Sequence, residues 1–339
     1  MKKAHLKIGL MGFGNIGVGS YQVLEMNRKQ ILAETGLDFE IVKILEKNAD
    51  RPRPVQVPRE IFTQDPDDIF CDPEIDIVIE LLGGIHPAAD LMLSAMNHGK
   101  HVVTANKAAV AAAYDELRKA AEDNHVLFRY EASVAGGIPI LSALTESLQA
   151  NEWTEVLGIL NGTTNYILTQ MTDFNLEYAD VLKTAQEKGF AEADPTADVE
   201  GIDAANKLSI LISLIFGHRV PPEEIPMEGI TRITKGDIAE ATESGNKIKL
   251  IATARKTADG GLEYSVKPTL IPFDHPLAGV SNEFNAVFVQ GNAVGELMFY
   301  GKGAGPLPTG SAVMGDVISI GKLIAKNAAY DNKVPGGRR

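Results

Sequence analysis

Apolar and polar positions alternate in two different ways along the chain. Through the first 135 residues, short runs of consecutive apolar residues alternate with longer stretches whose apolar residues recur at helical spacing. The expected strands are LKIGLMG at 6–12, FEIVKIL at 39–45, IDIVIELLG at 75–83, HVVTA at 101–105 and HVLFRYEA at 125–132, and the expected helices cover 16–34 and 108–124. Strands that alternate with helices indicate a parallel sheet covered on both faces.

After about residue 135 the rhythm changes to grouped helices and paired strands. Helices are expected at 138–150, 176–189 and 204–217, and strands at 153–162, 247–256, 262–271, 285–291 and 296–303. This is typical of an α+β domain on a largely antiparallel sheet. We therefore predict an α/β domain over 1–135 and an α+β domain over 136–310. A last helix at about 311–330 is expected to pack back on the first domain, and the tail DNKVPGGRR is expected to fray.

Composition narrows the range of partners. The 339 residues carry a formal net charge of −13, and such an acidic surface repels phosphate backbones, so nucleic acid is not an expected partner. The longest apolar run, LSILISLIF, is far shorter than the ~20 residues of a membrane span, and the N-terminus becomes glycine-rich too early for a signal peptide. With one cysteine, Cys71, the chain cannot form an intrachain disulfide. We expect a cytoplasmic protein.

The stretch GFGNIG at 12–17 follows the first strand and opens the first helix, which is the setting of a dinucleotide-binding fingerprint. Gly12 permits the tight turn, Gly14 lets a pyrophosphate approach the backbone, and Gly17 lets helix and strand pack closely. The helix N-terminus offers free N–H groups to the phosphates. A Rossmann-type domain that binds NAD or NADP is predicted, with contacts from Gly12, Phe13, Gly14, Asn15, Ile16 and Gly17.

The ends of the later strands add candidate cofactor contacts, because ligands in this fold bind beyond the carboxyl ends of the strands. Glu46 ends the second strand, where an acid usually holds the ribose hydroxyls of NAD. Its alternative is a solvated surface acid, and Lys47 or Arg51 could still serve the phosphate of NADP. The turns LLGG and TANK supply further candidates, which are Leu82, Gly83, Thr104 and Lys107. As a purely structural residue Lys107 would oppose the helix dipole.

An acidic stretch, GFAEADPTADVEGIDAANK at 189–207, ends in a lysine that enters an apolar run. Asp203 and Lys207 are four residues apart on an expected helix and share a face. From these residues alone, a surface ion pair worth well under about 1 kcal/mol is the preferred interpretation.

Several of these stretches together resemble homoserine dehydrogenases, over nearly the whole chain. The specific segments are VTANK at 103–107, EASVAGGIPI at 131–140, NGTTNYIL at 161–168, GFAEADPTADVEGIDAANKL at 189–208, DHPLAGV at 274–280 and GKGAGPLPTGSA at 301–312. The resemblance implies NAD(P)-dependent interconversion of L-homoserine and L-aspartate 4-semialdehyde, in threonine, methionine and isoleucine biosynthesis. Many members carry a C-terminal regulatory domain, and this chain ends shortly after its final expected helix, so feedback by that route is not expected.

The resemblance also implies roles for the acidic stretch. Hydride transfer to an aldehyde develops an alkoxide, which a neighbouring cationic acid stabilises and protonates, while carboxylates hold the substrate ammonium group. Lys207 matches the proton donor and Lys107 a second active-site lysine. Glu192 and Asp203 match substrate-binding acids, and Asp198 is expected near the substrate. Two glycines match backbone positions that contact the cofactor, namely Gly189 and Gly303, although turn geometry alone could also explain them.

The segment EASVAGGIP carries a further implication of the resemblance, a sodium ion. Glu131 and the backbone carbonyls of Val134, Gly136 and Ile138 would hold this ion through hard oxygen ligands. The alternative is a glycine-rich hinge between domains. The antiparallel sheet of the second domain is expected to pair with its copy in a homodimer.

Two departures and two rivals qualify the resemblance. Many members have arginine and aspartate where this chain has Leu45 and Glu46, which favours NAD or dual use. Aspartate-semialdehyde dehydrogenase needs a cysteine nucleophile in its substrate domain, whereas Cys71 lies in the cofactor domain. The other rival is a non-catalytic NAD(P)-binding sensor, which turnover would distinguish from an enzyme.

Overall fold

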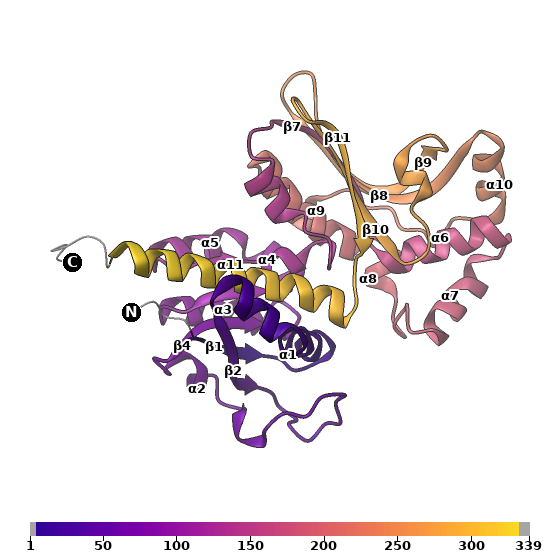
Figure 1. Cartoon of the computed structure of the whole chain (residues 1–339). Helices are drawn as coiled ribbons and strands as arrows, with labels where there is room; N and C mark the ends of the chain where they lie inside the picture. The colour runs from indigo at the N-terminus through magenta and orange to yellow at the C-terminus, as the bar shows by residue number, and fades with distance from the viewer. Residues whose placement is uncertain (1–4, 332–339) are drawn as a thin grey trace. The chain divides into compact units, whose positions relative to one another are not determined.

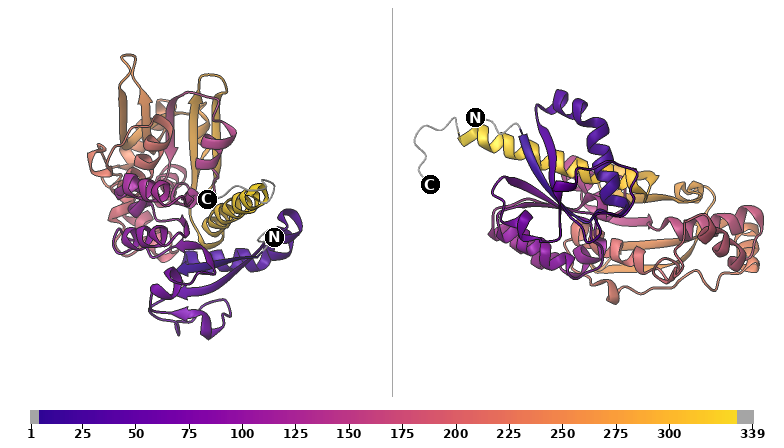
Figure 2. Two further views of the ribbon diagram at one scale, coloured as in Figure 1. Left: turned by 90° about the vertical axis from the view of Figure 1, so that its left-hand side faces the viewer. Right: turned by 90° about the horizontal axis from the view of Figure 1, so that it is seen from below.

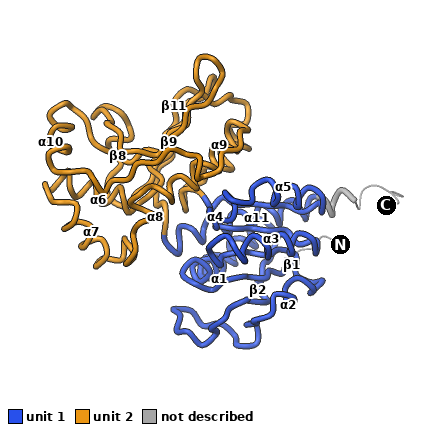
Figure 3. Tube along the Cα trace, turned by 180° about the vertical axis from the view of Figure 1, so that it is seen from behind, with its two compact units in different colours: residues 1–133, 305–339 blue, residues 134–304 orange. Residues whose placement is uncertain are grey.

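The computed structural model describes residues 5–331, so the end of the tail that was expected to fray lies outside the described residues. The chain divides into two compact units (Figure 3). The first comprises residues 1–133 and 305–339, and the second comprises Val134–Ala304. Each unit is built on its own sheet.

The sheet of the first unit has six strands in the order β3-β2-β1-β4-β5-β6, and every neighbouring pair is parallel. The strands are β1 (His5–Met11), β2 (Asp38–Leu45), β3 (Phe62–Thr63), β4 (Ile75–Glu80), β5 (His101–Thr104) and β6 (Phe128–Arg129). The central strands β1 and β4 are largely buried on both faces, as a sheet covered by helices on both sides requires. The predicted parallel α/β fold is confirmed.

The first unit's sheet is accompanied by helices and short helical turns. They are α1 (Asn15–Thr35), η1 (Arg59–Ile61), α2 (Asp67–Phe70), α3 (Ala88–Asn97), α4 (Lys107–Ala112), α5 (Tyr114–Asp123), η2 (Glu131–Ser133) and α11 (Pro306–Asp331). The single helix expected over 108–124 is interrupted at Ala113, whose φ and ψ of −110° and 28° are not helical. Propensity did not reveal this break, because alanine is the best helix former.

Helix α11 returns after the second unit and packs along α1 within the first unit (Figures 1 and 2). The two helices approach closely at glycines. A Cβ atom on Gly19 would lie 2.1 Å from the carbonyl oxygen of Pro306, and one on Gly310 would lie 2.7 Å from the backbone of Gly19. The helix starts at Pro306, earlier than the expected 311, because proline suits a first helical position. Its buried Val313 and Val317 join the core of the sheet.

The sheet of the second unit has five strands in the order β11-β10-β7-β8-β9, and all neighbours are antiparallel. The strands are β7 (Trp153–Ile159), β8 (Asn246–Lys256), β9 (Leu262–Pro272), β10 (Phe284–Gly291) and β11 (Gly295–Lys302). The predicted antiparallel sheet is confirmed. β11 is an edge strand on which no residue is fully buried, and it exposes Met298 and Tyr300.

Three helices of the second unit, α6, α9 and α10, contact the sheet at strand β8 (Figure 1). The helical elements are η3 (Ala143–Ser147), α6 (Gly162–Phe174), α7 (Tyr178–Glu187), α8 (Thr196–Val199), α9 (Ile202–Phe216), η4 (Pro222–Glu224), α10 (Lys235–Glu243) and η5 (Pro276–Gly279). The helix expected over 138–150 is reduced to little more than the π-helical turn η3. Ala135 and Gly136, which precede this segment, have a positive φ of 54° and are not helical.

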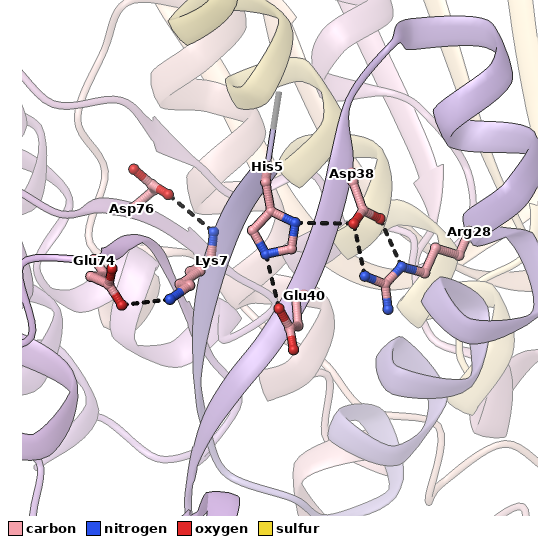
Figure 4. Close-up of polar contacts among 7 residues, drawn as sticks. All are labelled: His5, Lys7, Arg28, Asp38, Glu40, Glu74 and Asp76. Carbon is pink, nitrogen blue, oxygen red and sulfur yellow. Dashed lines mark hydrogen bonds and ion pairs between the residues drawn. The ribbon is translucent and has the colours of Figure 1, made fainter. Parts of the chain in front are cut away.

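A charged network joins β1, β2 and α1 at the amino ends of the strands (Figure 4). His5 contacts Asp38 at 3.0 Å and Glu40 at 2.9 Å, and Arg28 donates two hydrogen bonds to Asp38, at 2.7 and 2.8 Å. The hydrogen bonds from Arg28 lower the pKa of the Asp38 carboxyl to about 2. We call His5, Arg28, Asp38 and Glu40 the edge network. It lies at the opposite end of β1 from the glycine-rich turn. In the described part of the chain no helix has the length and apolar character of a membrane span.

Candidate active site and cofactor site

The glycine-rich turn after β1 has the geometry that a pyrophosphate needs. Gly12 has a φ of +95°, and a Cβ atom there would lie 2.6 Å from the carbonyl oxygen of Leu81. A Cβ atom on Gly17 would lie 2.3 Å from the carbonyl oxygen of Gly12, so close packing of helix and strand requires glycine. At Gly14 the position of a Cβ atom has no heavy atom within 4 Å. The residues therefore leave open space at the N-terminus of α1, where a phosphate group fits.

A pocket of about 140 Å³ opens beside this turn, entirely within the first unit. Its lining includes Phe13, Gly14, Asn15, Val18, Arg51 and Pro306. Phe13 and Val18 are buried, and Arg51 is exposed. The pocket therefore combines an apolar wall with a cation at its rim. Ile16 lies in the first turn of α1, which places the whole GFGNIG stretch at this end of the sheet.

Glu46 is held against the glycine-rich turn rather than solvated at the surface. Its carboxylate accepts hydrogen bonds from the backbone N–H groups of Phe13 at 3.2 Å and Asn48 at 3.0 Å. It also pairs with Arg53 at 3.1 Å, and only 18% of the Glu46 side chain is exposed. Arg53 in turn donates to the carbonyl oxygen of Phe13 at 3.0 Å and stacks over its ring. The structure thus places Glu46 beside the expected nucleotide site.

The ends of β4 and β5 are joined by Glu80, a residue that the sequence reasoning missed. Glu80 is fully buried and accepts hydrogen bonds of 2.7 Å from the hydroxyl of Thr104 and from the backbone N–H of Leu82. Asn106 caps α4 and donates to the carbonyl oxygen of Gly84 at 2.7 Å. Burial raises the pKa of the Glu80 carboxyl. A carboxylate at the carboxyl end of a largely apolar strand, IDIVIE, was the available signal.

These contacts bring the two predicted turns together. Leu82 and Gly83 are exposed, and the Cβ position at Gly83 is open. Lys107 is the first residue of α4 and is half-buried. Thr104 and Lys107 therefore lie in the turn that leads from β5 into α4, and they share it with Asn106.

In the second unit, Lys207 and Asp203 form a buried ion pair. The ammonium group of Lys207 donates to Asp203 Oδ2 at 2.6 Å and to the carbonyl oxygen of Leu160 at 2.7 Å. Lys207 is 8% exposed and Asp203 is 6% exposed. The preferred interpretation from the residues alone, a surface ion pair, is therefore wrong, because the apolar helix α9 carries both side chains into the interior.

Asn161 connects this ion pair to a second carboxylate. Its side-chain oxygen caps α6 by accepting from the N–H of Thr164, and its amide donates to Asp203 Oδ2 at 3.0 Å and to Asp198 Oδ1 at 2.7 Å. The hydroxyl of Thr163 donates to Asp198 Oδ2 at 3.0 Å. We call Asn161, Thr163, Asp198, Asp203 and Lys207 the buried acid–lysine network. Asn161 and Thr163 lie in NGTTNYIL, a segment that was singled out without assigning them roles.

The other expected residues of the second unit lie outside this network. Glu192 is exposed, and its backbone carbonyl accepts from Gln186. Gly189 follows α7 with a φ of +76° and open space at its Cβ position. At Gly303 a Cβ atom would lie 2.0 Å from the side chain of Asn285, so packing against this amide requires glycine. Packing, in addition to turn geometry, therefore explains the glycine at position 303.

The expected sodium ligands are buried but belong to both units. Glu131 lies in the first unit, where its N–H donates to Asp316 at 2.8 Å. Val134, Gly136 and Ile138 begin the second unit. A Cβ atom on Gly136 would lie 2.3 Å from the carbonyl oxygen of Gly303, which explains this glycine by packing. Among residues 5–331, no cluster of three or more His, Cys, Asp or Glu side chains is arranged to hold a metal ion.

The comparisons with known proteins all indicate the same family. Two models that describe homoserine dehydrogenase match the chain, the NAD-binding domain over residues 12–131 and the homoserine dehydrogenase domain over residues 139–318. The homoserine dehydrogenase of Bacillus subtilis is 44% identical over 318 residues, which cover 94% of this chain and 73% of that protein.

Solved structures agree with the sequence matches. The crystal structure of a homoserine dehydrogenase from Thiobacillus denitrificans superposes with a TM-score of 0.90 at 43% identity, and the match covers 98% of this chain and 76% of that one. A hyperthermophilic archaeal homoserine dehydrogenase in complex with NADPH superposes with a TM-score of 0.78 at 26% identity, covering 93% of this chain and 97% of that one.

Proposed function

Because this chain belongs to the homoserine dehydrogenase family and is an NAD(P)-dependent oxidoreductase of that kind, we propose that its buried acid–lysine network performs the interconversion of L-homoserine and L-aspartate 4-semialdehyde. The observation that carries this proposal is the placement of Lys207, a buried cation held by Asp203 and by a backbone carbonyl. A second carboxylate, that of Asp198, is linked to this pair through Asn161, whose amide donates to both Asp198 and Asp203.

Lys207 acts as the general acid toward the aldehyde and as the general base toward the alcohol. When bound, the nicotinamide cofactor supplies or accepts the hydride. As the hydride reaches the carbonyl carbon, negative charge develops on the oxygen, and a fixed cation in a poorly solvated site stabilises that charge. Asp203 fixes the position of the ammonium group through the 2.6 Å hydrogen bond. Proton transfer by a positioned side chain contributes about 10²–10⁴-fold to the rate.

The carboxylates bind the amino-acid end of the substrate. An ammonium group is held best by carboxylates in a site with little water. Asp198 is oriented by hydrogen bonds to both of its oxygens, from Asn161 and Thr163. Asp203 serves both the substrate and Lys207. Glu192 is exposed, and we propose that it meets the substrate at the outer side of the site.

The cofactor contacts that we propose come from the ends of the parallel strands. Pyrophosphate lies at the GFGNIG turn, and the residues Leu82, Gly83, Thr104 and Lys107 line the nicotinamide side. Gly189 and Gly303 contribute backbone contacts. The open Cβ positions at Gly14, Gly83 and Gly189 support these assignments, since each leaves room for a ligand.

For the adenosine end we propose that NAD and NADP are both accepted. Glu46 suits the ribose hydroxyls of NAD, but its carboxylate is already shared between two backbone N–H groups and Arg53. This pairing offsets much of the repulsion that a free carboxylate would exert on a phosphate. Arg51 stands exposed at the pocket rim, where it can pair with a phosphate. Initial rates with each cofactor at saturating homoserine test this; a preference beyond about 100-fold would contradict dual use.

Three finer assignments complete the proposal. A sodium ion is held by Glu131 and the carbonyls of Val134, Gly136 and Ile138, and replacing sodium by a bulky organic cation should lower the rate.

A homodimer forms through the antiparallel sheet, whose edge strand β11 exposes Met298 and Tyr300. Sedimentation measurements test the dimer, and a monomer at micromolar concentration would contradict it. The enzyme works in the cytoplasm.

The experiment that tests the proposed function is turnover. L-Homoserine is added at alkaline pH with NAD or NADP, and the absorbance of the reduced cofactor is followed. The expected result is steady formation of the reduced cofactor. Cofactor binding without turnover would favour the alternative, a non-catalytic NAD(P)-binding sensor. Absence of both would contradict the assignment of the cofactor site.

A further inference from the structure

Glu80 is a buried carboxylate whose hydrogen-bond donors are all uncharged groups. It ends β4 with no exposed surface, and its donors are the hydroxyl of Thr104, the amide of Asn106 and the backbone N–H of Leu82. These donors and a fourth, the backbone N–H of Gly83, are all neutral. A carboxylate in such surroundings is costly to bury, so its presence at a fully buried position calls for a reason.

The position of Glu80 in the sheet supplies that reason. The strand order places β4 directly beside β1, and the order of the chain reverses between these two strands. Ligands of open parallel sheets bind at such a switch point, beyond the carboxyl ends of the strands. Leu81, the next residue, donates to the carbonyl oxygen of Met11 at 2.8 Å and abuts Gly12 of the phosphate turn. Glu80 thus contacts the loops after β4 and β5, which the proposed function assigns to the nicotinamide side of the cofactor.

We propose that Glu80 is a positioning residue that also sets the balance between the oxidised and the reduced cofactor. This inference rests on the cofactor site of the proposed function. By binding Thr104 and Leu82, Glu80 fixes two loops that meet either form of the cofactor. Its negative charge distinguishes the two forms, because the nicotinamide ring is positively charged when oxidised and neutral when reduced, while the rest of the cofactor is the same. A buried carboxylate nearby therefore favours the oxidised form.

The test measures two dissociation constants, for NAD⁺ and for NADH, in wild type and in Glu80→Gln. Glutamine has nearly the same shape, and one oxygen can still accept from Leu82. The expected result is a loss of affinity for NAD⁺ of about fourfold relative to NADH, which a unit charge gives at roughly 10 Å and an effective dielectric constant of about 40. Because burial raises the pKa of the Glu80 carboxyl, both constants are measured at several alkaline pH values.

Two further variants separate charge from shape. Glu80→Asp keeps the charge but shortens the side chain, so both affinities should fall while their ratio stays near that of wild type. Asp76→Asn removes a unit charge from the amino end of the same strand, where Asp76 accepts from the N–H of Lys7, and should leave both constants unchanged. If Glu80→Gln does not fold, Glu80→Asp decides, because a lost preference for NAD⁺ there would overturn the inference.

The outcomes distinguish this inference from the proposed function. Equal weakening of NAD⁺ and NADH in Glu80→Gln would show a purely structural role and overturn the inference, while leaving the cofactor site intact. A wild-type protein that binds neither nucleotide would contradict the cofactor site and, with it, the inference. A shift in the ratio with normal thermal unfolding supports the inference.

Discussion

Two charged networks of this protein contain ion pairs of almost equal length in very different surroundings. In the edge network, Arg28 meets Asp38 at 2.7 Å, with side chains 37% and 26% exposed. In the buried acid–lysine network, Lys207 meets Asp203 at 2.6 Å, with side chains 11% and 8% exposed. An exposed pair contributes about 0–1 kcal/mol, whereas removing one partner of a buried pair costs about 3–5 kcal/mol. Burial, rather than distance, distinguishes the two.

The comparison also explains why only one of the two networks is suited to chemistry. Water around the edge network screens any charge that a reaction would develop there. In the buried network the ammonium of Lys207 is surrounded by fixed donors and acceptors, so it acts at full strength on a neighbouring oxygen. Asn161 contributes by holding two carboxylates with one amide.

The largest expected effect is on stability, in Asp203→Ala. This change leaves Lys207 as a buried cation whose carboxylate partner is gone, and it also removes an acceptor of Asn161. The free energy of unfolding should fall by about 3–5 kcal/mol, measured by urea denaturation at neutral pH. As a control, Glu177→Ala breaks the exposed pair with Lys235 and should cost less than about 1 kcal/mol. If Asp203→Ala lost no more free energy of unfolding than the control, the expected difference between buried and exposed ion pairs would be contradicted.

Lys249 sharpens the comparison, because it is buried without a carboxylate among its hydrogen-bond partners. It is 2% exposed and donates to the side chain of Asn165 at 2.9 Å and to the carbonyl oxygen of Val280 at 2.7 Å. Burial lowers its pKa to about 8. Between that value and the ordinary lysine pKa of about 10.4, the unfolded chain binds more protons, so the free energy of unfolding should rise with pH.

The expected rise across this window is roughly 3 kcal/mol. Lys249→Met removes the titrating group, so the difference in unfolding free energy between wild type and variant should change with pH only between about pH 8 and 10.4. Urea denaturation of both proteins at several pH values measures it. Lys247→Met, on the same strand and more exposed, is the matched control. A pH-independent difference between wild type and Lys249→Met would mean that burial does not lower the pKa of Lys249.

The third prediction concerns rate. In Lys207→Ala, kcat should fall by about 10²-fold or more, because the group that protonates the developing alkoxide is lost. The KM for cofactor should change little, since the parallel sheet lies in the other unit. Initial-rate assays that follow the absorbance of the reduced cofactor measure kcat and KM. The control variant is Lys188→Ala, which loses a hydrogen bond to Tyr166. Turnover of Lys207→Ala equal to that of the control would remove Lys207 from its role.

The sequence predicted both sheets because nearly every strand has a local signal, an apolar run or an alternation. The two-residue edge strand β3 has no such signal and was not predicted. It also placed GFGNIG at the end of β1, since the strand–turn–helix order is contiguous. It could not predict the burial of Asp203 and Lys207, because the pattern of a helix does not say what covers it. The roles of Asn161 and Glu80 depend on contacts between segments far apart in the chain, which no local pattern encodes.

The break at Ala113 and the short helical turn η3 mark the same limit for the fold. Alanine-rich and apolar stretches favour helix locally, yet the backbone at 113 is not helical and the segment 138–150 is helical only around η3. Tyr114, directly after the first break, is buried and contacts the hydroxyl of Tyr130 at 3.1 Å. Packing of this kind overrides propensity.

The smallest expected effect belongs to the edge network, in Arg28→Ala. At neutral pH the free energy of unfolding should fall by less than about 1 kcal/mol, because the pair is partly exposed. The pKa of Asp38 is lowered to about 2 in the folded protein, so the stabilisation is present above the ordinary aspartate value and is lost as the pH falls toward 2. The difference between wild type and Arg28→Ala should therefore shrink from about pH 4 downward, and it should also shrink with added salt. Thermal unfolding at low and high ionic strength measures it, with Arg118→Ala, which breaks an exposed pair on α5, as the control. A loss in Arg28→Ala that matched Asp203→Ala would mean that exposure does not govern these ion pairs.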